Sequence, residues 1–250
     1  MNSLRHYFHH SLSGYFYRRF RERLDSALKE KRPSEIDCHG VVLHIENLSP
    51  NMQSILRSGN YELPEISILP DLITSDDKIL EVGAAIGFLG IYCRKVIKVR
   101  DLVSVEPNPG TLNYLLLNYE LNGITPNVIQ GALTATDGPV PFHVSEMFWC
   151  DSLINRVDTQ NAREIIVDGL SFDSLVLRAG IRFNTLIIDI EGGEQYLPIS
   201  SFPHHLKKVL IEIHPELIGV RPAFDVLEKL ILSGFRIQAQ FHNTWALKRD

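Results

Sequence analysis

Apolar, strand-like segments alternate with amphipathic, helix-like segments along most of the chain. Strand-like runs occur at 78–82, 102–106, 127–133, 185–191, 208–214 and 235–242, and helical patterns separate most of them. Such alternation is typical of right-handed βαβ units, in which helices cover both faces of a parallel sheet. The sequence therefore predicts an α/β fold built on one open, mostly parallel sheet.

Two segments stand apart from this alternation. Residues 1–35 combine apolar residues at intervals of four with many Arg and His residues, and predict an N-terminal amphipathic helical extension. Residues 36–250 are predicted to form one domain, interrupted at 137–170 by a β-rich insertion. Three roles stay open for the extension: packing on its own domain or on a second subunit, peripheral contact with a membrane surface, and closure over the site.

The segment between the extension and the first regular strand has weaker signals. Residues 36–46 are predicted to form a strand or a hairpin. Residues 59–73 are predicted to form a loop that leads into a short helix, which Pro70 interrupts.

The composition narrows the class of partner. The 250 residues carry a formal net charge of −5, so no overall positive charge is available to hold a nucleic-acid duplex. We therefore expect a small-molecule partner and no nucleic acid.

The three cysteines, Cys38, Cys93 and Cys150, lack the number and spacing of a disulfide framework or a zinc cluster, which favours a reducing, cytoplasmic location. No apolar run approaches the roughly 20 residues that span a bilayer.

The turn after the strand at 78–82 limits the choice of ligand. A dinucleotide-binding turn has glycine at its first, third and sixth positions, which are here Gly83, Ala85 and Phe88. The bulk of Phe88 disfavours a nicotinamide or flavin dinucleotide. Glu106, at the tip of the next strand, can accept hydrogen bonds from both hydroxyls of a ribose. A ligand with one nucleoside and an amino-acid tail, such as S-adenosylmethionine, fits these residues better.

Several motifs together resemble the FkbM-type methyltransferases, a branch of the class I S-adenosylmethionine-dependent enzymes. They are ILEVGAAIG at 79–87, VSVEPNPGTLNYLLLNYELNG at 103–123, LIIDIEGGE at 186–194 and LIEIHPEL at 210–217. The resemblance implies a Rossmann-like sheet of seven strands, the last one antiparallel, with helices on both faces. It also implies methyl transfer from S-adenosylmethionine to a hydroxyl group of a carbohydrate, glycolipid or polyketide-type product.

The same resemblance implies roles for individual residues. Around the cofactor, Glu81, Gly83, Ala84 and Gly87 would surround the methionine part, Glu106 would hold the ribose, and Asn108, Gly131 and Ala132 would lie near the adenosine. Asp189, Glu191 and His214 would face the transferring methyl group and the acceptor, with Tyr61 and Glu62 beside substrate or cofactor. The chain departs from the family pattern at Glu81, where aspartate is common, and at Ala85, where asparagine is common.

Removal of the proton from an acceptor hydroxyl needs a base. His214 is favoured, because its ordinary pKa of about 6.5 suits neutral pH, whereas Asp189 or Glu191 would need a raised pKa. Structural roles stay open as well: Asp189 can cap the following helix, and His214 can be half of a polar pair with Glu212. Asp189, Glu191 and His214 are also of types that bind divalent cations, but their spacing does not require one, and no metal is predicted.

Two rival functions stay open beside the methyltransferase. One is a sensor or scaffold that binds the adenosyl cofactor without turnover, and the other is a nucleotide-dependent oxidoreductase on the same sheet. The acidic motifs at 189–194 and 212–217 favour an enzyme, because a scaffold without turnover has no need of them.

Overall fold

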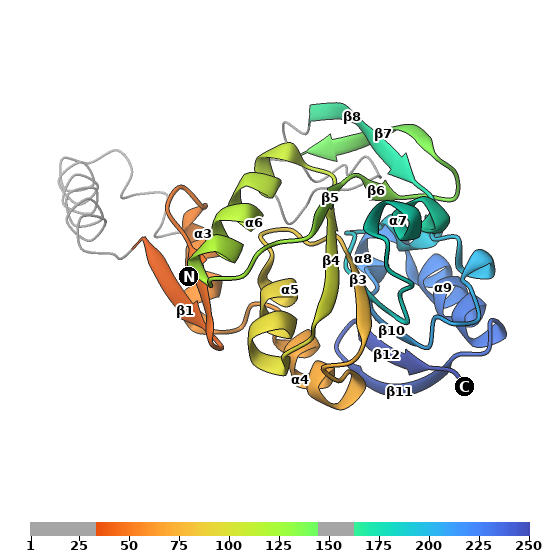
Figure 1. The fold of residues 1–250 in the computed structure, drawn as a ribbon. Coiled ribbons are helices and arrows are strands. Elements are labelled where there is room, and N and C mark those ends of the chain that lie inside the picture. The colour runs from red at the N-terminus through yellow and green to blue at the C-terminus, as the bar shows by residue number, and fades with distance from the viewer. Residues whose placement is uncertain (1–33, 145–162) are drawn as a thin grey trace, which may run out of the picture. The chain divides into compact units, whose positions relative to one another are not determined.

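A seven-stranded sheet lies at the centre of the described part of the chain, in the order β11-β12-β10-β9-β3-β4-β5 (Figure 1). The computed structural model describes residues 34–144 and 163–250. The strands are β3 (Lys78–Val82), β4 (Asp101–Glu106), β5 (Val128–Gln130), β9 (Thr185–Ile188), β10 (Lys208–Glu212), β11 (Arg236–Phe241) and β12 (Thr244–Lys248). β12 runs antiparallel to both β10 and β11, while β10, β9, β3, β4 and β5 pair in parallel. The predicted class I methyltransferase sheet, with its last strand antiparallel, is confirmed.

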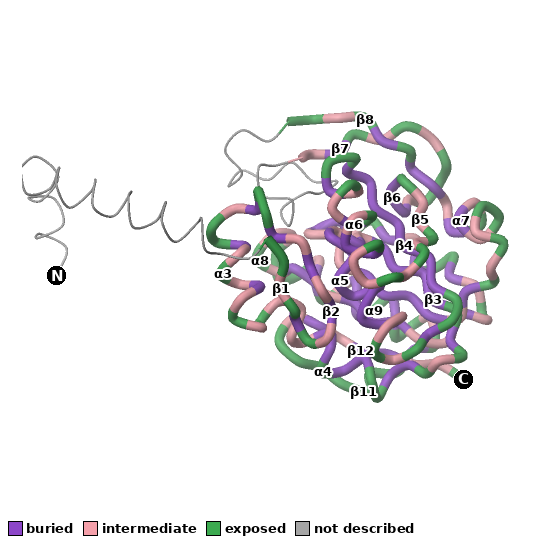
Figure 2. Tube along the Cα trace, turned by 60° about the vertical axis from the view of Figure 1, so that its left-hand side comes forward, coloured by how far each residue is buried: buried purple, intermediate pink, exposed green. Residues whose placement is uncertain are grey.

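Helices cover both faces of this sheet, as predicted. On one side lie α3 (Pro50–Ser58), α4 (Leu63–Leu72), α5 (Phe88–Tyr92) and α6 (Pro109–Leu121), and on the other α7 (Phe172–Ala179) and α9 (Val220–Leu232). Side chains of a strand alternate between the two faces. In β3, for example, Ile79 belongs to the hydrophobic cluster on the side of α3, α4, α5 and α6, and Leu80 to the cluster on the side of α7 and α9. The central strands are therefore buried on both sides, as the tube in Figure 2 shows.

Local signals in the sequence fix where the main helices begin. Asn108 precedes α6 and its side chain accepts a hydrogen bond from the amide of Gly110, and Ser171 caps α7 in the same way. Ser49 caps α3, a helix that the sequence analysis did not predict although Pro50 follows at its first position. A capping side chain followed by proline is a common helix start.

A hairpin of β1 (Glu35–Cys38) and β2 (Val41–His44) packs against α6, which confirms the hairpin alternative for residues 36–46. The side chain of Asn118 accepts a hydrogen bond from the amide of His44 at 2.8 Å. Asn122, one helical turn later, accepts from the amide of Val42 and donates to its carbonyl oxygen. The two amide side chains of α6 therefore satisfy backbone groups of β2 as a neighbouring strand would.

The segment 127–133 forms two strands and not the single one predicted. Gly131 has φ 155° and separates β5 from β6 (Ala132–Leu133), which belongs to another sheet. In this second sheet β6 pairs with β8 (Arg163–Leu170), and β8 pairs antiparallel with β7 (Gly138–Val144). β7 and β8 lie within the segment 137–170 that was predicted to be a β-rich insertion, and β6 precedes it. Residues 145–162 of the insertion and 1–33 of the N-terminal extension lie outside the described residues.

The remaining differences from the prediction are local. Pro70 lies inside α4 and the helix continues to Leu72, because a proline near the last turn costs only one hydrogen bond. The helical pattern that follows the strand at 78–82 forms α5 and then a π-helical turn, Cys93–Ile97. The chain does not close with the strand at 235–242: β12 follows β11 after a turn that includes His242 at φ 51°.

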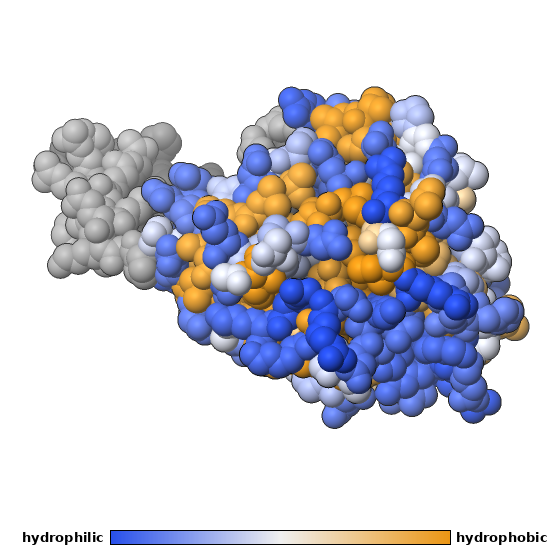
Figure 3. Space-filling view, in the orientation of Figure 1, coloured by the Kyte–Doolittle hydropathy of each residue, from blue (hydrophilic) through white to orange (hydrophobic). Residues whose placement is uncertain are grey.

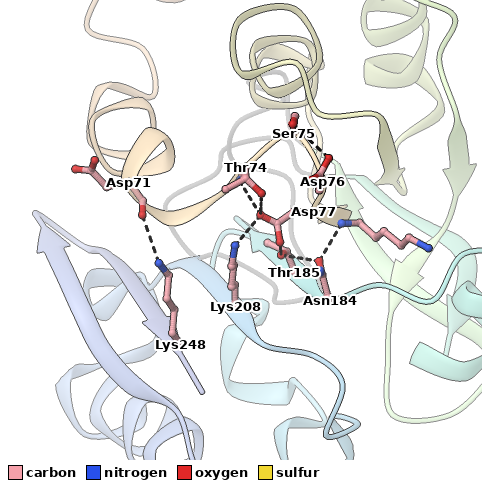
Figure 4. Close-up of polar contacts among 10 residues, drawn as sticks. Asp71, Thr74, Ser75, Asp76, Asp77, Asn184, Thr185, Lys208 and Lys248 are labelled. Carbon is pink, nitrogen blue, oxygen red and sulfur yellow. Dashed lines mark hydrogen bonds and ion pairs between the residues drawn. The ribbon is translucent and has the colours of Figure 1, made fainter. Parts of the chain in front are cut away.

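A buried ionic network ties the amino ends of β3, β9 and β10 together (Figure 4). Asp77 is 4% exposed and accepts hydrogen bonds from Lys208 Nζ at 2.7 Å and from the backbone amide of Thr74 at 2.7 Å. The hydroxyl of Thr185 also donates to it, at 3.3 Å. This network lies at the end of the sheet opposite to the carboxyl ends of the strands.

The surface of the described part is mixed in character. On the face drawn in Figure 3, hydrophobic residues form a band across the middle and hydrophilic residues cover the lower part. Among the described residues, no helix is both long enough and apolar enough to cross a membrane.

Candidate active site

A cavity of about 330 Å³ opens at the carboxyl ends of β3, β4, β9 and β10, within the range of small-molecule sites. This is the edge at which open α/β sheets bind their ligands. Its lining includes Tyr61, Glu62, Gly83, Glu106, Ala132, Asp189, Glu191 and His214 from the predicted set. The other predicted residues, Glu81, Ala84, Gly87, Asn108 and Gly131, do not line it.

Glu106 ends β4, and one oxygen of its carboxylate contacts the turn that follows β3. Its Oε2 accepts a hydrogen bond from the amide of Ala85 at 2.9 Å, and its Oε1 accepts one from the amide of Asn108 at 2.8 Å. Glu106 is therefore held in a fixed orientation at the cavity wall.

The turn after β3 is packed tightly against the end of β9. A Cβ atom added to Gly83 would lie 1.7 Å from the carbonyl oxygen of Asp189, so only glycine fits there. The amides of Gly83 and Ala84 both donate to the carbonyl oxygen of Val105, which anchors the turn to β4. The glycine that was predicted to admit a ligand thus also brings two backbone segments together.

Three residues that line the cavity have a left-handed backbone although they are not glycine. They are Glu62 at φ 53°, Ala85 at φ 46° and Glu191 at φ 49°. Such conformations cost about 1–3 kcal/mol each and persist where the surrounding structure enforces them. Their concentration at one cavity is typical of a functional site.

Glu81 lies in the interior and not at the cavity. It shares a strand face with Ile79, accepts a hydrogen bond from the amide of Gly90 at 2.7 Å, and accepts another from the hydroxyl of Ser104. Ser104 in turn contacts the hydroxyl of Tyr119 at 3.0 Å. Burial raises the pKa of Glu81 to about 7, although both hydrogen bonds to its carboxylate lower it.

At the other end of the cavity, His214 is surrounded by carboxylates. Its Nδ1 lies 3.0 Å from Oε1 of Glu194, which is fully buried. Its Nε2 lies 3.8 Å from Asp189 Oδ1, 3.8 Å from Glu191 Oε1 and 3.9 Å from Glu212 Oε1. Because an ionised carboxylate only accepts hydrogen bonds, Nδ1 carries a proton and Nε2 faces the other three acids.

This crowding shifts the pKa values of the cluster. Burial alone would lower the pKa of His214, but the hydrogen bond to Glu194 and the nearby acids raise it to about 10. Burial raises the pKa of Asp189 to about 6, against the opposing effect of His214. Burial and the charge of Asp189 raise the pKa of Glu212 to about 9. At neutral pH, His214 is thus protonated and Asp189 largely ionised, so Asp189 is the better proton acceptor of the two.

Helix α4 and the residues before it bring further acids to the same cluster. Glu62 has a pKa well above its usual value, first because of burial and then because of the charges of Glu65, Asp189 and Glu212. Glu65 is 4% exposed and accepts a hydrogen bond from the hydroxyl of Thr244. The ring of Tyr61 packs edge-on against Phe88, with centroids 5.5 Å apart. Glu65 and Glu194 were not predicted, because nothing in their own sequence surroundings indicates that they approach Asp189 and His214.

Comparison with known proteins assigns the chain to a family. The model of the methyltransferase FkbM domain matches residues 81–217, which is more than half of the chain. A comparison with curated proteins found no match.

Solved structures with a similar arrangement include three methyltransferase-related proteins. The FkbM methyltransferase of Methylobacillus flagellatus KT is 18% identical with a TM-score of 0.47, and the alignment covers 70% of this chain and 44% of that one. A methyltransferase of Pyrococcus furiosus is 10% identical with a TM-score of 0.45, covering 92% of this chain and 95% of that one. Aeropyrum pernix fibrillarin with natively bound S-adenosyl-L-methionine is 13% identical with a TM-score of 0.42, covering 70% and 67%. On the strength of the family model, which spans the β3 turn, Glu106 and the acidic cluster, the chain belongs to the FkbM family of methyltransferases.

Proposed function

We propose that the protein is an S-adenosylmethionine-dependent O-methyltransferase whose acceptor is a hydroxyl group of a carbohydrate, glycolipid or polyketide-type molecule. The observation that carries this proposal is the geometry of Glu106. Its carboxylate stands at the tip of β4 on the cavity wall, oriented by the amides of Ala85 and Asn108, in the place where an acid can accept hydrogen bonds from the hydroxyls of a ribose.

The residues present fit this cofactor. Next to Glu106 the cavity wall is apolar, with Pro107, Ala132 and Leu133, and these side chains suit the flat faces of an adenine ring. The acidic cluster at the other end suits the positive charges of the methionine part. When bound, S-adenosylmethionine supplies an electrophilic methyl group attached to a sulfonium.

Asp189 is proposed as the general base. It lines the cavity at the end of β9, next to His214. A carboxylate with a pKa of about 6 is largely ionised at neutral pH and basic enough to take a proton from a hydroxyl group as the group reacts. His214 then serves as a fixed positive charge that keeps Asp189 ionised, a different role from the base predicted from the sequence.

The lining of the cavity also supports a neutral, hydroxylated acceptor. Among the described residues that line it there is neither Lys nor Arg, so an anionic acceptor would lack a charged partner. The carboxyl groups of Glu62, Glu191 and Glu212 can form hydrogen bonds with hydroxyl groups, and Met52 and Phe142 provide apolar surface for the carbon skeleton.

The test is calorimetric titration of the full-length protein with S-adenosylmethionine and S-adenosylhomocysteine. We expect saturable binding that Glu106→Ala weakens by about 2 kcal/mol or more, the loss of a charge-assisted hydrogen bond. Glu228→Gln, on the exposed side of α9, is the matched control and should bind like the unchanged protein. If neither ligand binds, the proposal is wrong.

Binding alone does not separate an enzyme from a sensor or scaffold. A panel of hydroxylated acceptors, starting with sugars, is therefore incubated with S-adenosylmethionine labelled in its methyl group. Label in an acceptor that depends on Asp189 supports the O-methyltransferase, and binding without transfer to any acceptor supports the scaffold.

A further inference from the structure

Three side chains at the acceptor end of the cavity converge as metal ligands do. Asp189, Glu212 and His214 each offer one ligand atom, and these atoms all lie within 4.8 Å of one another. They come from the ends of the neighbouring strands β9 and β10, so the sheet itself holds them together. An ion about 2.1 Å from each ligand separates ligand atoms by roughly 3–4 Å, so a small inward shift of the side chains would complete the site.

The imidazole of His214 points to a ligand independently of the acids. His214 is only 6% exposed, yet its Nε2 makes no hydrogen bond with any described residue, because each surrounding carboxylate oxygen is at 3.8 or 3.9 Å. Asp189 Oδ1 and Glu191 Oε1 are the closest of these oxygens, each 3.8 Å from Nε2. Asp189 Oδ1 is also buried without a hydrogen bond. Two buried polar atoms therefore face each other across a gap too wide for a direct bond.

The second nitrogen of the ring is held as it is in many metal sites. Nδ1 of His214 donates to Glu194, and the same Glu194 oxygen accepts a hydrogen bond from the amide of Gly192 at 3.0 Å. A buried carboxylate on the far nitrogen fixes the ring and directs Nε2 outward, which is the usual support for a metal-binding histidine.

The charge balance also favours a cation. Glu62, Glu65, Glu191 and Glu194 lie around the three converging residues, and no described Lys or Arg lines the cavity. A divalent cation can bind carboxylate oxygens and a neutral imidazole nitrogen at the same time.

We propose that Asp189, Glu212 and His214 form a binding site for a divalent cation at the acceptor end of the cavity, where the ion would replace the proton on Nε2 of His214 and supply the positive charge beside Asp189 that His214 supplies in the metal-free protein. The purpose given to this cation rests on the proposed function. Coordination positions left open on the ion would hold the acceptor hydroxyl and make it more acidic. Since each carboxylate offers one oxygen to the ion, the second oxygen of Asp189 stays available for the proton.

The test is titration of the full-length protein with Mn²⁺ alone, followed by electron paramagnetic resonance, because free aqueous Mn²⁺ gives a sharp signal that disappears on binding. We expect one saturable site per chain. Glu212→Gln and Glu194→Gln should each weaken it by about 10–100-fold, the first by loss of a ligand and the second by loss of support for His214. His214→Asn should remove the nitrogen coupling from the spectrum of bound Mn²⁺.

Glu106→Gln is the matched control, because it changes an acid of the same cavity that is not a ligand. It should keep Mn²⁺ binding and lose affinity for S-adenosylmethionine, while Glu212→Gln should weaken Mn²⁺ binding. Glu212→Gln keeps the size and shape of the side chain and should therefore fold. His214→Asn is a second variant that tests the same site. Absence of saturable Mn²⁺ binding, or binding that Glu212→Gln and His214→Asn leave unchanged, overturns the inference.

The two proposals fail separately in these measurements. If Mn²⁺ does not bind but S-adenosylmethionine binds through Glu106, the cation site is wrong and the proposed function stands. If Mn²⁺ binds and S-adenosylmethionine does not, the cation site stands and the proposed function is wrong.

Discussion

Replacing Glu81 with glutamine should change how the stability of the protein depends on pH. The native pKa of Glu81 is about 7, against about 4.5 in an unfolded chain. Between these values the folded protein keeps a proton that the unfolded chain releases, so the free energy of unfolding falls as the pH rises. At 1.36 kcal/mol per pKa unit, the loss between pH 5 and pH 8.5 is about 2–3 kcal/mol.

Glutamine can take over the hydrogen bonds of this site. Its carbonyl oxygen can accept from the amide of Gly90, and its NH₂ group can donate to Ser104, whose hydroxyl can then donate to Tyr119. The variant therefore keeps the network and loses the ionisation. Urea denaturation of both proteins from pH 5 to pH 8.5 should give curves that diverge, with Glu81→Gln becoming the more stable protein as the pH rises.

Two outcomes would refute this reasoning about Glu81. Parallel stability curves would mean that its carboxyl group does not titrate in a buried position. A loss of more than about tenfold in affinity for S-adenosylmethionine would mean that Glu81 contacts the cofactor, as the family resemblance implies, and is not confined to the interior.

The other predictions concern the packing of the sheet and the β3 turn. Asp77→Ala leaves Lys208 without its buried partner and should lower the free energy of unfolding, measured in urea, by about 3–5 kcal/mol. Affinity for S-adenosylmethionine should not change. A loss of stability below about 1 kcal/mol would contradict the role given to the ionic network around Asp77. Gly83→Ala forces a Cβ atom against the carbonyl oxygen at the end of β9. It should lower the free energy of unfolding by several times the loss of about 1–2 kcal/mol expected for Gly180→Ala, whose Cβ meets nothing within 4 Å. Equal losses of stability in thermal unfolding of the two variants would refute the close packing. Ala85→Asn should stabilise the protein by up to about 1 kcal/mol, since asparagine tolerates φ 46° better than alanine, and calorimetry should show equal or tighter binding of S-adenosylmethionine; weaker binding would speak against it.

The sequence predicted those strands and helices whose local pattern of apolar residues and caps matches their place in the sheet. Apolar runs and helix caps locate most strands and helices of the sheet, and Glu106 follows from its place at the tip of β4. The convergence of Asp189 with His214 also follows from the sheet, because β9 and β10 pair in parallel and end at the same edge. The family resemblance implied an antiparallel last strand, but the position of β12 between β10 and β11 was not predicted, because the pattern ended at residue 242.

The chemistry of the site was less predictable, because it depends on contacts between distant segments. Glu65 reaches Asp189 from a helix more than a hundred residues earlier. His214 stays protonated against the effect of burial because of its hydrogen bond to Glu194 and the charges of Asp189 and Glu191. The motif places Glu81 at the cofactor, whereas its position on the same face as Ile79 turns it toward the interior. Side-chain alternation along β3 was the available signal for that orientation.

The pairing of β2 with α6 has a practical consequence for the boundaries of the protein. The family model begins at residue 81, but Val41 and Leu43 of the hairpin belong to the same hydrophobic cluster as α5 and α6. A chain shortened to the family boundary would uncover one side of that cluster and leave the fully buried amide of Asn118 without its backbone partner. The smallest unit that folds is thus larger than the unit that sequence comparison recognises, and any minimal version of this methyltransferase has to retain the hairpin.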